Sequence, residues 1–390
     1  MFTFRNTKNL IFQLNAASSQ GCLGALFHQD LSCRSILLIT DKGVREAGLI
    51  DGAVANLQAH GVHVAIFDQV EADPPEAIIH QATEAAAGVD GILGFGGGSS
   101  MDVAKVVAFL QGTTTQTLPD LYGVDQCVGT RLPLVQVPTT AGTGSEVTPI
   151  SIVTTGTNSK MGIVSPHLLP DAAVLDGNLT LSVPPLVTAA TGIDAMVHCL
   201  EAFTSKIKKN PLSDLLALEG LRLLGANIRT VCADGSDADA RGAMLLGSMY
   251  GGMAFANAPV GAVHALAYPV GALFKVPHGL SNSLMLPHVL RYNGELPTAE
   301  ALYAQMLPEA FPELAASALA SGRTGTDLFA QGFEDLANDL GIETRLSQVG
   351  IAEGDVGTLA AQAMLQTRLL PNNQREVTEK DAIALYNQAL

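Results

Sequence analysis

The sequence of 390 residues contains no tryptophan and only five cysteines, and no two of these cysteines form a CxxC pair. The cysteines are odd in number and scattered along the chain, a pattern that argues against a disulfide framework and against a zinc site built from thiolates. We therefore expect five reduced thiols. The absence of tryptophan carries no functional information.

Charged residues are scarce as well, at 15% of the chain against 47% hydrophobic residues. This composition excludes a disordered or fibrous protein. We find no uninterrupted apolar run of about 18 residues, the length needed to cross a bilayer. The first ten residues, "MFTFRNTKNL", lack the apolar segment of a signal peptide. We expect a cytoplasmic protein with no membrane partner.

Basic residues are outnumbered, and the formal net charge is −16. Such a charge repels the phosphate backbone of nucleic acid, and no run of lysine and arginine offsets it. We therefore expect no nucleic-acid partner.

Short apolar segments alternate with amphipathic segments in the first half of the chain. This alternation is typical of a parallel sheet covered by helices on both faces, a Rossmann-like α/β fold. The segments expected to be strands are 35–40, 63–68, 91–97, 132–140, 151–155 and 171–177, and those expected to be helices are 44–59, 75–87 and 100–110.

Beyond Pro185 the pattern is almost entirely helical, so we expect an α/β domain over residues 1–184 and an all-α domain over 185–390. The Pro184-Pro185 pair marks the boundary. The last helix is expected to begin with a capping box formed by Thr378 and Asp381. The expected helical segments are 191–203, 211–228, 238–256, 326–341 and 378–390.

A glycine-rich stretch, "GFGGGSSMDVAK" (94–105), follows a predicted strand and opens a predicted helix. Three consecutive glycines, Gly96 to Gly98, allow backbone amides at a helix N-terminus to approach a diphosphate closely. The spacing differs from GxGxxG because Ser99 stands where the third glycine would be. A tight turn between packed elements is the alternative interpretation.

Two further stretches favour a dinucleotide. Asp41 ends the strand at 35–40, where a carboxylate binds ribose hydroxyls and repels a 2′-phosphate, which favours NAD over NADP. Asp at this place also begins turns and caps helices. In "PTTAGTGSEVTP" (138–149) the hydroxyls suit a ribose or a nicotinamide amide, with a polar surface loop as the alternative. These hydroxyls belong to Thr139, Thr140, Thr143 and Ser145.

Histidines that lie among apolar residues indicate a metal site in the second half of the chain. Asp194 and His198 are four residues apart, so they share one face of a predicted helix with apolar neighbours. They either hydrogen-bond each other or bind a common partner. His264 and His278 lie in a similarly apolar stretch. One carboxylate and three imidazoles suit a divalent ion such as Fe²⁺ or Zn²⁺.

The chain resembles the iron-containing (group III) alcohol dehydrogenase family over nearly its whole length. The resemblance rests on four stretches that occur in the family's order: "GGGSSMD" (96–102), "PTTAGTGSEVTP" (138–149), "GIDAMVHCLEAF" (192–203) and "GAVHALAYPVGALFKVPHG" (261–279). It implies an NAD-binding domain at 1–184 and a helical, metal-binding catalytic domain at 185–390.

The resemblance also implies residue roles. The metal ligands would be Asp194, His198, His264 and His278. The cofactor would contact Asp41, Gly96, Gly97, Gly98, Ser99, Ser100, Asp102, Thr139, Thr140, Thr143, Ser145, Val147, Lys160 and Leu181. Tyr268 is a departure, because many members carry a histidine at this cleft position. It puts in doubt any proton relay that needs a second imidazole there.

The implied function is that of a metal- and NAD-dependent alcohol dehydrogenase. It would oxidise a small alcohol reversibly to an aldehyde or ketone by hydride transfer, with the alcohol oxygen bound to Fe²⁺ or Zn²⁺. The resemblance further implies a homo-oligomer, a dimer or larger. The alternatives are a maleylacetate-reductase-like enzyme, a dehydroquinate-synthase-like lyase and a non-catalytic nucleotide- and metal-binding protein. The complete set of four ligands argues against the first, and the scarcity of basic residues against the second.

Overall fold

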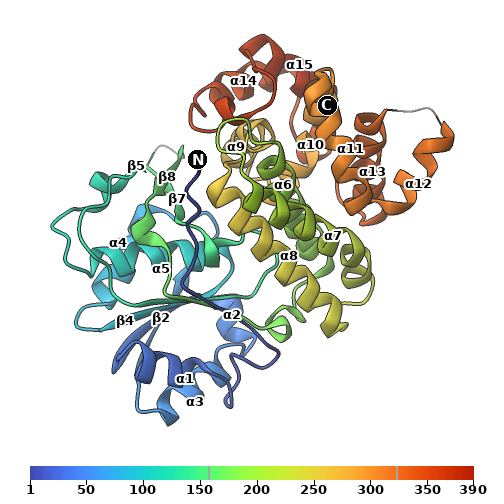
Figure 1. Cartoon of the computed structure of the whole chain (residues 1–390). Coiled ribbons are helices and arrows are strands. Elements are labelled where there is room, and N and C mark those ends of the chain that lie inside the picture. Colours follow the sequence, from blue (N-terminus) through green and yellow to red (C-terminus); the bar gives the residue numbers. More distant parts are fainter. Residues whose placement is uncertain (157–158, 322–323) are drawn as a thin grey trace. The chain divides into compact units, whose positions relative to one another are not determined.

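The computed structural model describes residues 1–156, 159–321 and 324–390, which form two compact units (Figure 1). The sheet unit consists of Arg5–Thr140 and Gly144–Ser182. The helical unit consists of Met1–Phe4, Ala141–Thr143 and Val183–Leu390. The functional division at residues 184 and 185 stays a prediction.

The sheet unit contains a six-stranded sheet in which all strands run parallel, in the order β1-β9-β6-β4-β2-β3. The chain passes outward from β2 to β3 and then returns to the other side of β2 with β4. This reversal of strand order is where open α/β sheets bind ligands, at the carboxyl ends of the strands. The bounds are β1 (Asn9–Phe12), β2 (Ser35–Asp41), β3 (His63–Val70), β4 (Gly91–Gly96), β6 (Leu134–Pro138) and β9 (Ala172–Leu175).

Helices cover both faces of this sheet, as the alternation in the sequence predicts. Leu37 and Ile39 of β2 belong to a core that includes α4 (Glu76–Ala85) and α5 (Gly98–Leu110). The intervening residues of β2 belong to a second core that includes α1 (Leu23–Ala25) and α3 (Asp51–Ala59). Figure 1 shows these two pairs of helices on opposite sides of β2 and β4. The expected α/β fold class is confirmed.

Two local expectations need correction. The single helix expected over 44–59 is two helices, α2 (Lys42–Glu46) and α3, separated by a turn in which Gly48 has a φ of +69°. The strand expected at 151–155 exists as β7 (Ile150–Thr155), but it lies outside the parallel sheet. It pairs antiparallel with β8 (Ser159–Val164), which also pairs with β5 (Gly123–Val124) in a separate three-stranded sheet.

All secondary-structure elements of the described residues after Pro184 are helices, which confirms the expected all-α region. The last helix begins with the predicted capping box, because Thr378 Oγ1 accepts from Asp381 N and Asp381 Oδ2 accepts from Thr378 N. The bounds are α6 (Pro185–Thr204), α7 (Pro211–Ala233), α8 (Ala238–Asn257), α9 (Ala262–Phe274), α10 (His278–Gly294), α11 (Pro297–Ala310), α12 (Pro312–Ser321), α13 (Gly325–Asp339), α14 (Val356–Met364) and α15 (Glu379–Ala389).

Helix α6 forms the centre of the helical unit and packs against α7, α8 and α10. By its length and composition, this helix departs from the expectation that no segment is suited to cross a membrane. Its 20 residues reach a hydropathy of 1.3 and are long and apolar enough for a span, although 83% of the apolar window is buried inside the protein. Core helices of soluble proteins have the same length and composition, so the finding is weak support for a membrane span.

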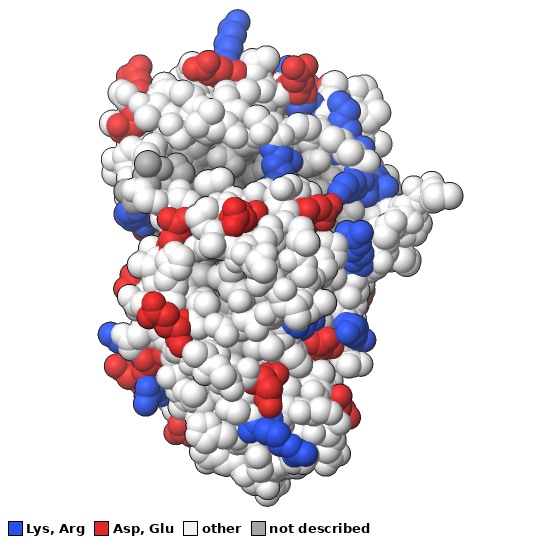
Figure 2. Space-filling view, turned by 90° about the vertical axis from the view of Figure 1, so that its left-hand side faces the viewer, with Lys and Arg blue, Asp and Glu red and all other residues white. Residues whose placement is uncertain are grey.

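Charged side chains of both signs are interspersed on the face shown in Figure 2, with wide uncharged areas among them. This distribution agrees with the low charged fraction of the sequence.

Candidate functional site

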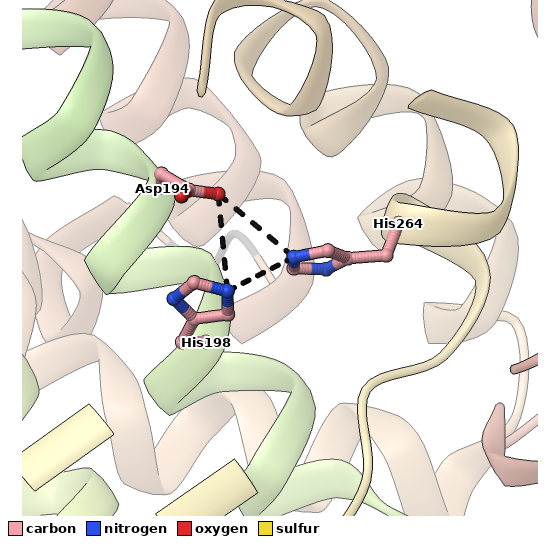
Figure 3. Close-up of side chains that lie close together, drawn as sticks. All are labelled: Asp194, His198 and His264. Carbon is pink, nitrogen blue, oxygen red and sulfur yellow. Dashed lines mark hydrogen bonds and ion pairs between the residues drawn. The ribbon is translucent and has the colours of Figure 1, made fainter. Parts of the chain in front are cut away.

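Three of the predicted metal ligands converge in the helical unit. Helix α6 carries Asp194 and His198 on one face, and α9 carries His264 opposite them, so that the three side chains point toward one another (Figure 3). One ligand atom from each lies within 4.8 Å of the others, and all three residues are buried. Asp194 Oδ1 lies 4.0 Å from His198 Nε2 and 3.8 Å from His264 Nε2, and the two Nε2 atoms are 3.1 Å apart.

The fourth predicted ligand, His278, is the first residue of α10, and its Nε2 lies 3.6 Å from Asp194 Oδ1. The next residue explains how α10 comes so close to α6. A Cβ atom at Gly279 would lie 2.1 Å from the carbonyl oxygen of Ala190, so only glycine fits there. We call Asp194, His198, His264 and His278 the donor cluster. The structure brings these four residues together, and their role as ligands stays a prediction.

The hydrogen bonds of the two buried histidines leave their Nε2 atoms facing each other. Burial lowers the pKa of His198 to about 4, so its imidazole is neutral at pH 7. His198 Nδ1 lies 3.2 Å from the carbonyl oxygen of Gly142, and His264 Nδ1 lies 2.6 Å from Glu201 Oε2. These oxygens accept hydrogen bonds, which places the ring proton on Nδ1. Two lone pairs 3.1 Å apart repel each other unless a cation lies between them, so the residues fit a divalent ion.

Asn282 contributes to the donor cluster and was missed in the sequence. Its Nδ2 donates to Asp194 Oδ1 at 2.6 Å and lies 3.2 Å from His264 Nε2 and 3.4 Å from His278 Nε2. Burial acts to raise the pKa of Asp194, but the three imidazoles and the Asn282 amide outweigh burial and hold this pKa below its usual range. Asn282 follows His278 by four residues, so it shares a helix face with that predicted ligand. This spacing was the available signal.

Aromatic rings flank the donor cluster. Phe255 stacks against His198 with ring centroids 4.3 Å apart. Tyr268, expected one helical turn after His264, lies with its ring centroid 6.3 Å from that of His264 and 5.7 Å from that of His278. Tyr268 therefore lies beside two predicted ligands, as the spacing indicates. Its role stays a prediction.

In the sheet unit, the predicted diphosphate site lies where the strand order reverses. Asp41 ends β2 and caps α2 by accepting from Val44 N at 3.0 Å, while Gly96 ends the neighbouring β4. Gly96 has a φ of +154°, and a Cβ atom there would lie 2.7 Å from Ser100 Oγ and 3.4 Å from Asp41 Oδ2. The residue must be glycine, because a side chain would collide with Ser100 at the start of α5.

Buried hydroxyls without a hydrogen-bond partner lie in the same region. Ser100 Oγ and Thr40 Oγ1 make no hydrogen bond to the described residues, although both atoms are buried. Buried hydroxyls normally find a partner, so these two fit a polar ligand such as a dinucleotide. Thr40 directly precedes Asp41 and was missed in the sequence, where a threonine inside an apolar strand gave no distinct signal.

Three other predicted cofactor residues also belong to this region. Thr139 N donates to the carbonyl of Gly96 at 3.0 Å. A Cβ atom at Gly97 would lie 3.6 Å from Thr140 Oγ1. Ser99 lies in the first turn of α5, which begins at Gly98 and leaves its first amides without intrahelical acceptors.

Asp102 and Ser145 have protein partners that the sequence did not reveal. Asp102 Oδ1 accepts from Ser145 Oγ at 2.6 Å and from Lys105 Nζ at 3.3 Å, and its Oδ2 accepts from Ile152 N at 2.9 Å. Lys105 is fully buried and also donates to Ser145 Oγ at 2.6 Å, Thr148 Oγ1 at 3.1 Å and the carbonyl of Ile150 at 2.6 Å. The contacts of Asp102 and Ser145 with NAD stay predictions.

Burial shifts the ionisation of this group. It lowers the pKa of Lys105, an effect that the Asp102 carboxylate opposes. It raises the pKa of Glu146 to about 7, although Lys105 lies near enough to oppose this shift. We call Asp102, Lys105, Ser145, Glu146 and Thr148 the lysine cluster.

The remaining predicted cofactor residues lie in varied surroundings, and their roles stay predictions. Lys160 lies on β8 and its Nζ pairs with Asp73 Oδ1 at 2.7 Å. Val147 is fully buried, whereas Leu181 is 36% exposed. Thr143 belongs to the helical unit.

A metal-dependent oxidoreductase is the class of protein that combines a glycine turn at the switch point of a parallel sheet with a helical unit bearing converging aspartate and histidine ligands. The sequence profile of iron-containing alcohol dehydrogenase matches residues 16–177. The profile of the C-terminal part of the Fe-containing alcohol dehydrogenase family matches residues 188–390. The chain belongs to the iron-containing alcohol dehydrogenase family, which confirms the resemblance and the enzyme class.

Known relatives match nearly end to end. The long-chain-alcohol dehydrogenase 1 of Geobacillus thermodenitrificans is 37% identical over 365 residues, covering 92% of this chain and 90% of that protein. The 1,3-propanediol dehydrogenase of Citrobacter freundii is 35% identical, with 92% of each chain covered. The crystal structure of a 1,3-propanediol oxidoreductase covers 100% of both chains with a TM-score of 0.92 and 32% identity.

Proposed function

We propose that this chain is a metal- and NAD-dependent alcohol dehydrogenase that interconverts a small alcohol with its aldehyde or ketone. The observation that carries the proposal is the convergence of two Nε2 lone pairs and the Asp194 carboxylate in a buried site. When bound, the ion supplies a Lewis acid for the alcohol oxygen, and NAD accepts the hydride.

The donor cluster holds the ion. One carboxylate and three imidazoles suit Fe²⁺, which the family's name indicates, and they suit Zn²⁺ as well. Asn282 orients Asp194 by donating to Oδ1, and Gly142 fixes the His198 ring through its carbonyl. The Phe255 ring on His198 excludes water from one side of the site.

Residues 1–184 bind NAD and residues 185–390 bind the metal and carry the catalytic site. Asp41 receives the adenosine ribose, while the glycine turn and the start of α5 hold the diphosphate. The further contacts are Asp102, Thr139, Thr140, Thr143, Ser145, Val147, Lys160 and Leu181. Support comes from the buried hydroxyls of Ser100 and Thr40, which have no hydrogen-bond partner among the described residues.

The substrate is a small, uncharged alcohol or aldehyde. The relatives named above act on long-chain alcohols and on 1,3-propanediol, so the family accommodates apolar chains as well as short diols. Phe255 places an aromatic ring beside the donor cluster, in an apolar group that includes Val260, Leu369 and Tyr268. Apolar surroundings favour an uncharged substrate.

The protein is a cytoplasmic homo-oligomer, a dimer or larger. The oligomer is supported by β1, an edge strand with exposed Leu10, Phe12 and an exposed Leu14 just beyond it. An unpaired edge with apolar side chains favours pairing with another chain. The cytoplasmic location is supported by five free thiols. Sedimentation of the purified protein tests the oligomer, and a monomer at micromolar concentration would contradict it.

The principal test is turnover with a panel of short alcohols and aldehydes, followed through the absorbance of NADH. The protein is purified anaerobically and its metal content is measured first. We expect bound Fe²⁺ or Zn²⁺, loss of turnover after chelation, and recovery when the ion is restored. Absence of turnover on the whole panel, with metal and NAD both bound, would favour a binding protein without catalysis.

The coenzyme choice has a separate test in Asp41→Asn. The amide keeps the cap on Val44 N but removes the charge that repels a 2′-phosphate. We expect kcat/KM with NADP to rise relative to that with NAD, with no change in metal content. An unchanged ratio would show that Asp41 does not select the coenzyme.

A further inference from the structure

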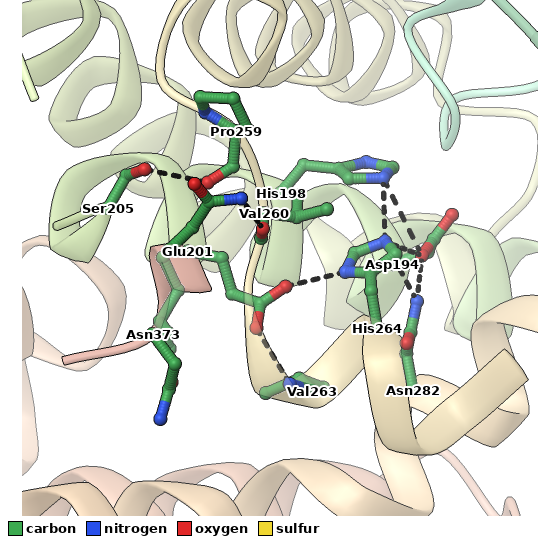
Figure 4. Close-up of polar contacts among 12 residues, drawn as sticks. Asp194, His198, Glu201, Ser205, Pro259, Val260, Val263, His264, Asn282 and Asn373 are labelled. Atoms are coloured by element: carbon green, nitrogen blue, oxygen red, sulfur yellow. Dashed lines mark hydrogen bonds and ion pairs between the residues drawn. The ribbon is translucent and has the colours of Figure 1, made fainter. Parts of the chain in front are cut away.

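Glu201 is a buried carboxylate one helical turn after His198 on α6, and it contacts the donor cluster from outside (Figure 4). Its Oε2 lies 2.6 Å from His264 Nδ1, and its Oε1 accepts from Val263 N at 2.7 Å. Among the ion pairs of the described residues, none joins Glu201 to a lysine or an arginine. Its position is therefore defined by two donors of the first turn of α9.

The two contacts together fix the orientation of the His264 ring. Val263 precedes His264, so the carboxylate is anchored to the same helical turn that carries the imidazole. An oxygen that only accepts faces Nδ1, which keeps the ring proton on that atom and turns Nε2 toward Asp194. A carboxylate near the start of α9 is also favoured by the helix dipole.

The charge of Glu201 fits the same arrangement. Asp194 and Glu201 are the carboxylates in contact with the His264 ring, and both are buried. A divalent cation bound by the donor cluster would balance the charge of these two carboxylates. Buried carboxylates without such compensation are costly.

We propose that Glu201 is the positioning residue of the metal site. It holds His264 with the proton on Nδ1 and the lone pair of Nε2 directed at the ion, and it raises the affinity of the donor cluster for a divalent metal. The proposal rests on the proposed function in one respect, because it takes the donor cluster as the metal site. A carboxylate behind a ligating histidine commonly changes metal affinity by about 10–100-fold.

A purely structural role would have a different signature. If Glu201 only tied α9 to α6, its loss would destabilise the fold and leave the metal affinity of the folded protein unchanged. Metal affinity and stability must therefore be measured separately.

The test compares Glu201→Gln with the matched control Glu300→Gln. Glu300 is another partly buried carboxylate of the helical unit, and it accepts from Gly325 N at 2.7 Å and from Thr326 N at 2.9 Å at the start of α13. Each substitution removes one charge from a carboxylate that binds the first turn of a helix. Glu300 has no hydrogen bond or ion pair with the donor cluster among the described contacts.

Zn²⁺ affinity of the metal-free proteins is measured by competition with a chelator, and their thermal unfolding is measured without metal. We expect Glu201→Gln to weaken Zn²⁺ binding by about 10–100-fold. We expect Glu300→Gln to stay within about twofold of the original protein, because it leaves all four ligands untouched. Equal Zn²⁺ affinity of Glu201→Gln and the original protein would overturn the proposal.

The tautomer of His264 gives a readout that needs neither metal nor activity. In ¹⁵N-histidine-labelled, metal-free protein, the two-bond proton–nitrogen correlations distinguish the tautomers, and His264→Gln identifies the His264 signal among nine histidines. We expect the Nδ1–H form in the original protein and a shift toward Nε2–H in Glu201→Gln. An Nε2–H ring in the original protein would overturn the proposal.

These measurements also separate the proposal from the proposed function. If the original protein binds no divalent ion, the metal-dependent function fails, while the tautomer still decides whether Glu201 orients His264. If Glu201→Gln does not fold, the tautomer of the original protein decides alone.

Discussion

Two polar clusters of this protein each contain an aspartate, and they differ in whether the chain itself supplies a cation to it. In the lysine cluster the cation belongs to the chain, because Lys105 Nζ is surrounded by four oxygen acceptors. In the donor cluster no lysine or arginine forms an ion pair with Asp194 among the described residues. Instead, the Nε2 atoms of His198 and His264 face each other.

The difference separates a structural cluster from a binding site. A buried group of carboxylates and hydroxyls is stabilised by its hydrogen bonds, and Lys105 supplies them to Asp102, Ser145 and Thr148, although Glu146 Oε1 is buried without a partner among the described residues. Asp194 has no lysine or arginine beside it among the described residues, and the Asn282 amide donates its hydrogen bond. The lysine cluster is thus closed by its own chain, whereas the donor cluster is completed by an ion.

The largest effect is expected from His264→Ala, which breaks the donor cluster. It removes one of three buried ligand atoms and leaves the Glu201 carboxylate without its imidazole. We expect metal content to fall together with kcat/KM, the latter by about 10³-fold or more. Metal analysis and the NADH assay check both quantities, with His288→Asn as a control histidine on α10 outside the donor cluster. Full metal content with normal turnover would refute the site.

Lys105→Met is expected to break the lysine cluster without affecting the metal. It leaves Asp102 and its hydroxyl partners buried without their cation, which costs about 3–5 kcal/mol of the free energy of unfolding. Urea unfolding of the metal-free protein measures the change, and metal content per folded molecule should stay the same.

The matched control for this change is Lys8→Met, because Lys8 also pairs with an aspartate, Asp171, but is 75% exposed. Its loss should cost at most about 1 kcal/mol. If the two variants are equally stable, the lysine cluster contributes no more than a surface ion pair.

Glu146→Gln tests the lysine cluster through the pH dependence of the free energy of unfolding. Burial raises the pKa of Glu146 from its usual value of 4.5 to about 7 in the folded protein, so its contribution to stability is present below pH 4.5 and is lost as pH rises through 7. Glutamine mimics the protonated form at every pH. The stability of the variant relative to the original protein should therefore rise by about 2 kcal/mol between pH 5 and pH 8.

Urea unfolding at both pH values checks this trend. Glu219→Gln serves as the control, because Arg222 and its hydrogen bond hold the pKa of the exposed Glu219 below its usual range. That contribution is lost only as pH falls below about 4.5, so the stability difference for Glu219→Gln should stay nearly constant between pH 5 and pH 8. A pH-independent difference for Glu146→Gln would show that Glu146 is ionised in the folded protein throughout this range.

The smallest effect is expected from Tyr268→Phe. A phenol is a poor base near pH 7, so we expect the proton to leave through water or the cofactor's ribose hydroxyls. The variant should keep its metal and stay within about threefold of the original kcat. A collapse of turnover with the metal still bound would show that the Tyr268 hydroxyl takes part in the reaction.

Much of the fold and of the candidate site could be predicted because the signals are local. The four-residue spacing of Asp194 and His198 places both on one helix face, whatever packs against it. Alternating strand residues such as Leu37 and Leu38 predict the two cores of the parallel sheet. The glycine turn at 96–98 likewise needs only the end of a strand and the start of a helix.

What the sequence left open depends on contacts between distant segments. Glu201 contacts His264, which lies 63 residues further along the sequence, and Asp102 contacts Ser145, which lies 43 residues further along. The carbonyl of Gly142 reaches His198 because residues 141–143 pack with the helical unit. Similarly, the sequence suggested a strand at 151–155 but not the separate sheet that contains it.

The sequence by itself therefore determined which residues could bind a metal and a dinucleotide, because spacing along a helix or strand fixes which side chains share a face. Only the tertiary structure decided which partners these residues have. It gave Asp102 the Ser145 hydroxyl, His264 a carboxylate and Asp194 the Asn282 amide. The physical reason is that hydrogen bonding and charge balance depend on distances between segments that no local pattern specifies.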